Sequence, residues 1–415
     1  MTASAATAQT LDAGAIAHIS DHFSEPDWLR ALRAGWWSRA EATPPPTGQE
    51  EEWRRTDLAP LPRDGELHLG APRVEVSLPP GAAEAGVVVT DLRDAVSQHP
   101  ELVQRWLGRS EGPASHAHFW ALAQAAWTGG LFVHVPRGVT VDGTIVARTM
   151  LDRGDVTYLP ITLLVAEERS TVSVLDTVVS PDGVSGWFGG IVDVRAEQAS
   201  TVRYANLQQL GDGSWNVGAQ RVVVGQDATV TTLNAEVGSK ITKIGLDVDM
   251  SGKGGTSAVL GLLAAGDDQH IDINAHQRLA ADHTTSDLLY LSALYDRARA
   301  AFYGVTSVEL GTKQTASYQE CRNLLLSPDA GAEPIPVLEI KANDILRCGH
   351  GATAGAIDPT QLFYARTRGL DPDAAERMIV RGFFEQVVGQ IHDETIRERV
   401  LAALARRIGS VEDFA

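Results

Sequence analysis

The chain has 415 residues, and its 53 acidic and 35 basic residues give it a net charge of −18. This charge argues against a nucleic-acid or anionic-membrane surface, because phosphate groups are bound by basic patches. No apolar run approaches the roughly 18 residues of a membrane span, and residues 1–14 lack the basic and apolar parts of a secretory signal. Two cysteines in so long a chain indicate a reducing environment, so we expect a cytoplasmic protein.

Residues 1–125 are predicted to form a mainly helical region. A helical pattern covers Asp27–Arg33, and Trp36, Trp37 and Trp53 are expected to pack the core of this region. Two short strands are predicted within Val74–Thr90. Two further helices are predicted at Leu92–Gln98 and Glu101–Leu107, separated by a His-Pro break.

Residues 126–352 are predicted to be β-structure, because short runs of β-branched and alternating apolar residues are separated by polar turns. The runs are Leu131–Val135, Ile161–Val165, Thr171–Val174, Ile191–Val194, Thr201–Tyr204, Arg221–Val224 and Thr229–Leu233.

A weak internal repeat runs through this β-region. Residues 168–172, 198–202 and 227–230 each contain a polar turn, a small residue and the start of a strand. Such a helix-free repeat favours a β-solenoid, whose turns stack and bury a shared core. A sandwich of two sheets is the alternative. A solenoid leaves strand edges open at its ends, and the flanking helical regions are candidates to cover them.

Residues 353–415 are predicted to be helical. Asp358-Pro359 and Asp371-Pro372 each place an N-cap aspartate before a proline at the first helical position, and a third helix is expected from about Asp393. The second of these helices carries an apolar stripe, which consists of Met378, Ile379, Gly382, Phe383 and Val387. Internal packing explains such a stripe, but a region this small has little core of its own. Met378, Ile379 and Phe383 are therefore candidates for binding a partner protein.

The segment Cys348-Gly349-His350 carries the most distinctive chemistry, since thiolate and imidazole bind soft and borderline metals. On a strand, a spacing of two puts Cys348 and His350 on one face. Gly349 and Gly351 leave room for a backbone or a cofactor to approach. The second cysteine, Cys321, is predicted to be buried. A typical iron–sulfur cluster takes four thiolates, so any cluster here needs ligands from another chain.

Other motifs are weak or missing. His270, His276 and His283 are spaced so that no single strand or helical turn brings them together, and we expect them on surfaces or turns. The sequence has no P-loop, Rossmann fingerprint, HExxH or GxSxG motif. The sequence therefore shows no nucleotide site and no hydrolytic nucleophile of its own.

The segment LEIKANDILRCGHGATAGAIDPTQLFYARTRGL, residues 338–370, closely resembles a region of the SufB/SufD family of iron–sulfur cluster assembly scaffolds. Its C-x-H-G-A-T motif begins at Cys348 and its LFY motif is Leu362–Tyr364. Further matches are Asn323–Ser327, His276, Ser286–Tyr290, Pro26–Leu29 and Trp53–Thr56.

SufB-type chains of this family have a glutamate directly after the histidine, together with more cysteines. Here Gly351 follows His350, so the resemblance is closer to the SufD type. Asn343-Asp344 stands where the family has paired aspartates, which we expect to alter a turn contact.

The resemblance implies a right-handed parallel β-helix between N-terminal and C-terminal helical regions. It also implies a complex with a SufB-type scaffold subunit and a SufC-type ATPase, the latter docked on the C-terminal helices. Cys348 and His350 match positions that contribute to iron or a transient iron–sulfur cluster at the SufB interface. Some complexes of the family bind reduced flavin, although this sequence has no flavin motif. No cofactor is expected to bind the isolated chain tightly. The resemblance leaves the oligomeric state of the isolated chain open, with a homodimer as one alternative.

Two other functions fit the sequence less well. A carbohydrate-active β-helix enzyme requires a carboxylate cluster in a groove and secretion. A purely structural homodimer would keep Cys348 and His350 buried and inert.

Overall fold

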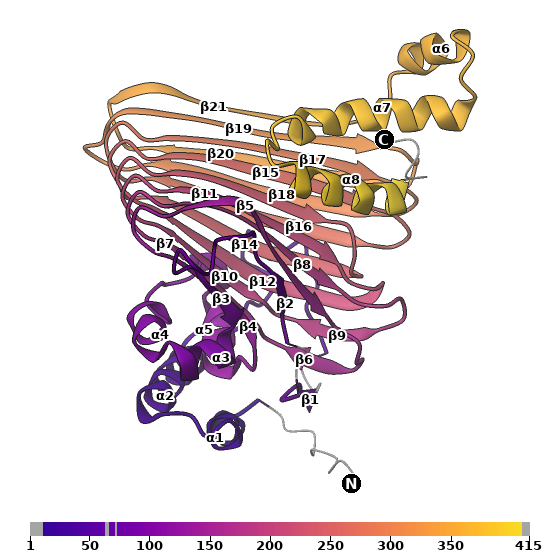
Figure 1. Cartoon of the computed structure of the whole chain (residues 1–415). Coiled ribbons are helices and arrows are strands. Elements are labelled where there is room, and N and C mark those ends of the chain that lie inside the picture. The colour runs from indigo at the N-terminus through magenta and orange to yellow at the C-terminus, as the bar shows by residue number, and fades with distance from the viewer. Residues whose placement is uncertain (1–10, 63–65, 71–72, 409–415) are drawn as a thin grey trace.

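The computed structural model describes residues 11–62, 66–70 and 73–408. Its centre is a β-solenoid of about eight turns with helices before and after it, as Figure 1 shows. The predicted fold class is thereby confirmed, and the sandwich is excluded because the strands of the solenoid pair in parallel. Residues 1–10, which hold most of the segment tested for a secretory signal, lie outside the described ranges.

The N-terminal region forms helices where capping signals and apolar spacing coincide. The Asp91 side chain accepts a hydrogen bond from the Arg93 N–H at one helix start, and Pro100 occupies the first turn of the next helix. Both helices lie within one residue of their predicted positions. The elements are α1 (Ala13–His22), α2 (Asp27–Ala42), β1 (Glu66–Leu67), β2 (Glu75–Ser77), β3 (Val88–Asp91), α3 (Leu92–Gln98), α4 (Pro100–Trp106), the 3-10 helix η1 (Ala114–His116) and α5 (Ala117–Ala126).

The solenoid consists of two facing sheets, A and B, and successive long strands alternate between them. Sheet A runs β3, β4 (Gly130–Val135), β7 (Ile161–Ala166), β10 (Ile191–Ala196), β12 (Gly213–Val224), β14 (Ile241–Met250), β16 (His270–Leu279), β18 (Arg299–Val308), β20 (Gly331–Ile340), with β1, β6 (Val156–Tyr158) and β9 (Ser185–Phe188) attached. Sheet B runs β2, β5 (Thr140–Met150), β8 (Thr171–Val179), β11 (Thr201–Gln209), β13 (Thr229–Glu236), β15 (Thr256–Ala265), β17 (Thr285–Leu294), β19 (Lys313–Leu325), β21 (Asp344–Ala356).

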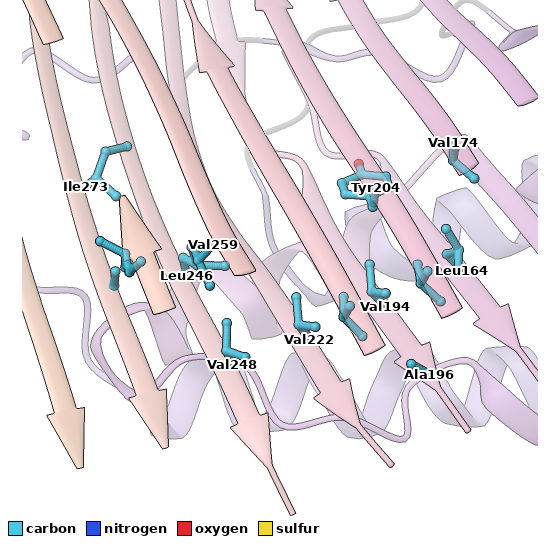
Figure 2. Close-up of a cluster of buried hydrophobic side chains, with 14 of the residues drawn as sticks. Leu164, Val174, Val194, Ala196, Tyr204, Val222, Leu246, Val248, Val259 and Ile273 are labelled. Carbon is cyan, nitrogen blue, oxygen red and sulfur yellow. The ribbon is translucent and has the colours of Figure 1, made fainter. Parts of the chain in front are cut away.

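The internal repeat arises because equivalent residues of successive turns pair with one another in sheet B. Thr171, Thr201 and Thr229 stand on one another across three turns, one at the start of each strand. Side chains at alternate positions then enter the space between the sheets, where they form the apolar cluster drawn in Figure 2. Each fully buried valine or leucine of this cluster contributes about 1.5–3 kcal/mol. The members that Figure 2 labels include Val174, Tyr204 and Val259 of sheet B and Leu164, Val194 and Val222 of sheet A.

The N-terminal region packs on the outer face of sheet A. Of the tryptophans predicted to pack the core of the helical region, Trp36 and Trp53 are buried and Trp37 is half-buried. Trp53 and Trp120 belong to one buried apolar cluster with side chains of sheet A such as Leu163. A buried ion pair lies at the same interface, with Lys243 Nζ 2.7 Å from Asp272 Oδ2.

The C-terminal helices are α6 (Pro359–Thr367), α7 (Pro372–Val388) and α8 (Glu394–Ile408). Asp358 and Asp371 cap the first two as predicted, each accepting a hydrogen bond from a helical N–H. α7 and α8 cover part of the outer face of sheet B. The C-terminal helical region begins later than the predicted residue 353, because β21 pairs with β19 as far as Ala356.

The apolar stripe expected on α7 is only partly the packing face. Val387 is buried, but Met378 and Gly382 are exposed. The face that packs on sheet B is rotated from the expected one, and it consists of Val380, Phe384, Val387 and Val388. Within the described ranges, no helix combines the length and apolarity that a membrane crossing requires.

Candidate functional site

The candidate site lies at the end of the solenoid that is remote from the N-terminal helices (Figure 1). β20 is the last strand of sheet A and β21 is the last strand of sheet B. Each pairs with a neighbouring strand on one side only among the described residues. The segment Cys348-Gly349-His350 therefore belongs to an edge strand.

Cys348 and His350 continue two interior columns of side chains. Cys348 stands in register on Ser317, and His350 stands on Gln319. Both of these β19 residues are buried between the sheets, and side chains in register share a direction. Cys348 and His350 therefore share the inward face, as their spacing predicts, at the open mouth of the solenoid.

The environments of the two cysteines differ. Cys348 is partly buried, and this burial raises the pKa of its thiol. Cys321 is buried one turn deeper, where burial raises the pKa to about 12. Its sulfur lies 3.6 Å from the Asn323 amide nitrogen. Cys321 is thus the buried structural residue that was predicted, and a metal bound by Cys348 must displace the thiol proton.

A buried polar network lies directly behind the site, and the sequence reasoning missed it. The Gln277 Nε2 atom donates to the Ser286 hydroxyl and carbonyl, and Thr306 donates to Gln277 Oε1. Ser317 donates to the Ser286 carbonyl, and Gln319 donates to a backbone carbonyl of β18. A signal for this network was present in the sequence. Serines and glutamines occupy inward positions of strands in which apolar and polar residues otherwise alternate regularly.

The glycines of the motif do not open the Cys–His face. Gly349 and Gly351 occupy the opposite face of β21, where Tyr318 packs. A Cβ atom on Gly349 would lie 3.3 Å from the Tyr318 ring, and one on Gly351 would lie 3.2 Å from its hydroxyl. The expectation of free space beside the site is therefore corrected: the glycines accommodate Tyr318.

Other histidines do not join the site. The His270 Nε2 atom lies 3.0 Å from the Thr56 hydroxyl, and His276 Nδ1 lies 3.1 Å from Asp247 Oδ1. His283 occupies a turn with a φ of 59°. The described part of the chain contains no group of three or more His, Cys, Asp or Glu side chains placed to hold a metal ion.

The C-terminal helices expose a second candidate surface. Phe363 and Tyr364 of α6 are 68% and 59% exposed, and Met378 of α7 is 50% exposed. Ile379 is half-buried, and Phe383 packs against the cluster between α7 and sheet B. Of the three stripe residues predicted to bind a partner, only Met378 is fully exposed, whereas Ile379 is half-buried and Phe383 packs against the core. The most exposed aromatic pair lies in the LFY motif, which the sequence already marked.

Two protein-family models match the chain. The model of the SUF system FeS cluster assembly SufBD core domain covers residues 149–383, which is more than half of the chain. The model of the SufBD protein N-terminal region covers residues 73–146.

Individual relatives agree with these matches. An iron–sulfur cluster assembly SufBD family protein of Mycobacterium leprae is 28% identical over 380 residues, covering 88% of this chain and 91% of the relative. SufBD family proteins of Staphylococcus saprophyticus and Staphylococcus epidermidis are each 26% identical over 303 residues. Those alignments cover 73% of this chain and 65% of each relative, so the chain spans just under two thirds of their length. The chain belongs to the SufBD family of the SUF system for iron–sulfur cluster assembly.

Proposed function

We propose that this chain is a SufD-type, non-catalytic scaffold subunit that works in the cytoplasm with a SufB-type subunit and a SufC-type ATPase. One observation carries the proposal: the last turn of the solenoid is open and presents Cys348 and His350 on its inward face. Gly351 after the histidine and the presence of two cysteines support the SufD type.

The open edge of β21 suits the addition of a partner strand. The Ala316 N–H donates to the Thr284 carbonyl, so Ala316 points its backbone toward β17. Arg347 stands on Ala316 in the same register and points toward β19. Because backbone direction alternates along a strand, the N–H and C=O groups of Cys348 and His350 face the open edge, where a SufB-type strand would pair with them.

The edge of β20 is less suited than that of β21 to the addition of a partner strand. The N–H groups of Gly331 and Lys341 donate to the carbonyls of Ala298, just before β18, and Val308, at its end. The backbone of odd-numbered residues therefore faces β18, and that of even-numbered residues faces outward. Pro334 and Pro336 occupy two of these outward positions and have no N–H to offer. Apolar contact nearby comes from Leu346, which is 65% exposed. The same open end supports pairing with a second copy of this chain when partners are absent.

The proposed interface between β21 and the SufB-type subunit would bind iron or a nascent iron–sulfur cluster. Cys348 would bind as a thiolate after losing its proton, and His350 would bind through a ring nitrogen. Two ligands from this chain leave the remaining positions to the SufB-type subunit. Supporting this division, the described residues supply no third ligand near the pair.

The SufC-type ATPase is proposed to dock on α6 and α7. Phe363, Tyr364 and Met378 are exposed on these two helices, and exposed aromatic residues are typical anchors of protein interfaces. Ile379 and Phe383 lie on the same helix as Met378 and would support the surface from its base.

The test is co-expression with SufB-type and SufC-type partners, followed by anaerobic cluster reconstitution. His350→Ala should leave the complex intact but lower the cluster content by roughly tenfold, as expected for loss of a metal contact. His392→Ala, an exposed histidine between α7 and α8, is the matched control. Wild-type cluster content in the His350 variant would refute its role.

Assembly is tested separately from cluster formation. Leu346→Glu places a charge at the open end and should reduce recovery of the SufB-type subunit but not of the ATPase. Phe363→Glu should do the reverse. Loss of both partners in either variant, without loss of fold by circular dichroism, would contradict the assignment of two separate surfaces.

A further inference from the structure

A groove runs between α8 and the outer face of sheet B, and its volume is about 550 Å³. Its floor is a strip of β5, β8 and β11 that includes Val146, Met150 and Val179. These three side chains remain half-buried. α7 and α8 bury the neighbouring part of the same sheet face, so the strip is the side of that face left without a helix.

The wall of the groove is basic. Arg399 and Arg406 are separated by seven residues on α8, a spacing that places both on one face of the helix. Both are exposed, and neither has an acidic partner among the described residues. Arg148 projects from the floor and lies 3.3 Å from Glu75, a carboxylate that is itself exposed. Three arginines thus surround an apolar strip on a chain whose net charge is −18.

We propose that this groove binds an acidic amphipathic helix of a partner protein. A helix placed beside α8 would cover the strip as α7 and α8 cover the rest of the face, at the usual spacing of about 8–10 Å between helix axes. Its apolar stripe would rest on Val146, Met150 and Val179. Its carboxylates would face Arg399 and Arg406. The groove is separate from the aromatic pair on α6 and from the open edge, so this interaction goes beyond the proposed function.

The test uses the full-length chain and a fluorescein-labelled helical peptide of about 15 residues. The peptide carries leucines on one stripe and glutamates beside it, and binding is followed by fluorescence anisotropy at about 50 and about 300 mM NaCl. The expected result is saturable binding that weakens with salt. Arg399→Glu/Arg406→Glu should weaken binding by about tenfold or more, because two attractions become repulsions.

The matched control is Arg366→Glu/Arg397→Glu, which changes the net charge equally at exposed arginines outside the groove. Equal weakening in both double variants would show a general charge effect and overturn the proposal. Equal binding of a peptide with lysines in place of glutamates would also overturn it. A third arm removes residues 409–415, whose sequence is Gly-Ser-Val-Glu-Asp-Phe-Ala. If the peptide binds only after this removal, the chain's own tail is the occupant and the proposal of a partner fails.

Discussion

The two ends of the solenoid are built differently. At the first end, β3 pairs antiparallel with β4 and the N-terminal helices follow the outer face of sheet A. At the second end, β20 and β21 have no further strand beside them among the described residues. The N-terminal region and the face of sheet A that it covers contain buried ion pairs and tryptophans. The difference supports the proposal that the second end is left for association, whereas the chain itself closes the first.

The largest effect is expected where the N-terminal region meets sheet A. Asp272 Oδ2 accepts from Thr56 at 2.6 Å and pairs with the fully buried Lys243. Asp272→Asn would leave the Lys243 ammonium without a counter-charge, which costs about 3–5 kcal/mol in the free energy of unfolding. Urea unfolding followed by tryptophan fluorescence measures this loss.

The control for Asp272 is an exposed ion pair of similar length. Arg297 and Asp268 are 2.7 Å apart and both are 65% exposed. Asp268→Asn should leave the unfolding midpoint nearly unchanged, because water and salt screen exposed pairs. A comparable loss in both variants would remove the distinction between a sealed interface and an open surface.

A buried carboxyl group in the closed interior should make stability depend on pH in the mildly acidic range. Burial raises the pKa of Glu236 to about 7 from an ordinary 4.5. The folded chain then holds this proton more tightly than the unfolded chain, so stability falls as pH rises from about 4.5 to 7. The fall is roughly 3 kcal/mol. Glu236→Gln should flatten it, whereas Glu385→Gln, on the exposed side of α7, should not. Parallel pH profiles for the two variants would exclude Glu236 as the source.

Adjacent proline substitutions test whether the edge of β21 is free. The N–H of Thr353 points toward β19, whereas that of Ala354 points outward, by the alternation described for Arg347. Thr353→Pro should lower the free energy of unfolding by about 1–3 kcal/mol through a lost ladder hydrogen bond. Ala354→Pro should cost less but should impair association with the SufB-type subunit. Equal destabilisation by both would mean that the outward N–H groups already have partners.

The smallest effect is a difference in thiol reactivity. Burial raises the pKa of both thiols, but Cys321 is enclosed whereas Cys348 lies at the mouth. Iodoacetamide should label Cys348 slowly in the native chain, faster as pH rises, and Cys321 only after unfolding. Adding the SufB-type subunit should protect Cys348. Native labelling of Cys321 at a similar rate, measured by mass spectrometry of Cys348→Ser, would contradict this order.

Much of the fold follows from local signals in the sequence. Alternating apolar residues located the strands, and the stacked repeat at Thr171, Thr201 and Thr229 gave their register. The aspartate-proline pairs located α6 and α7. The polar turns at 168–172 and 198–202 were also predicted, but their backbone conformation was not, because Arg169 and Ala199 adopt the left-handed conformation that usually marks glycine.

The candidate site was less predictable because its setting depends on long-range packing. Strand periodicity placed Cys348 and His350 on one face, but it could not show that Tyr318 fills the space beside Gly349. Nor could it show which side of α7 meets sheet B, since Met378 and Phe384 are both apolar and only the second is buried. Neighbours from distant turns decide both outcomes.

The two prolines of β20 have a consequence for the chain before it meets a partner. An open solenoid end is a template on which other unfolded or newly made chains could add strands and aggregate. Pro334 and Pro336 remove donors from one half of that template and leave β21 as the main place for addition. Before a partner subunit binds, a newly synthesised chain is then less prone to seed fibres.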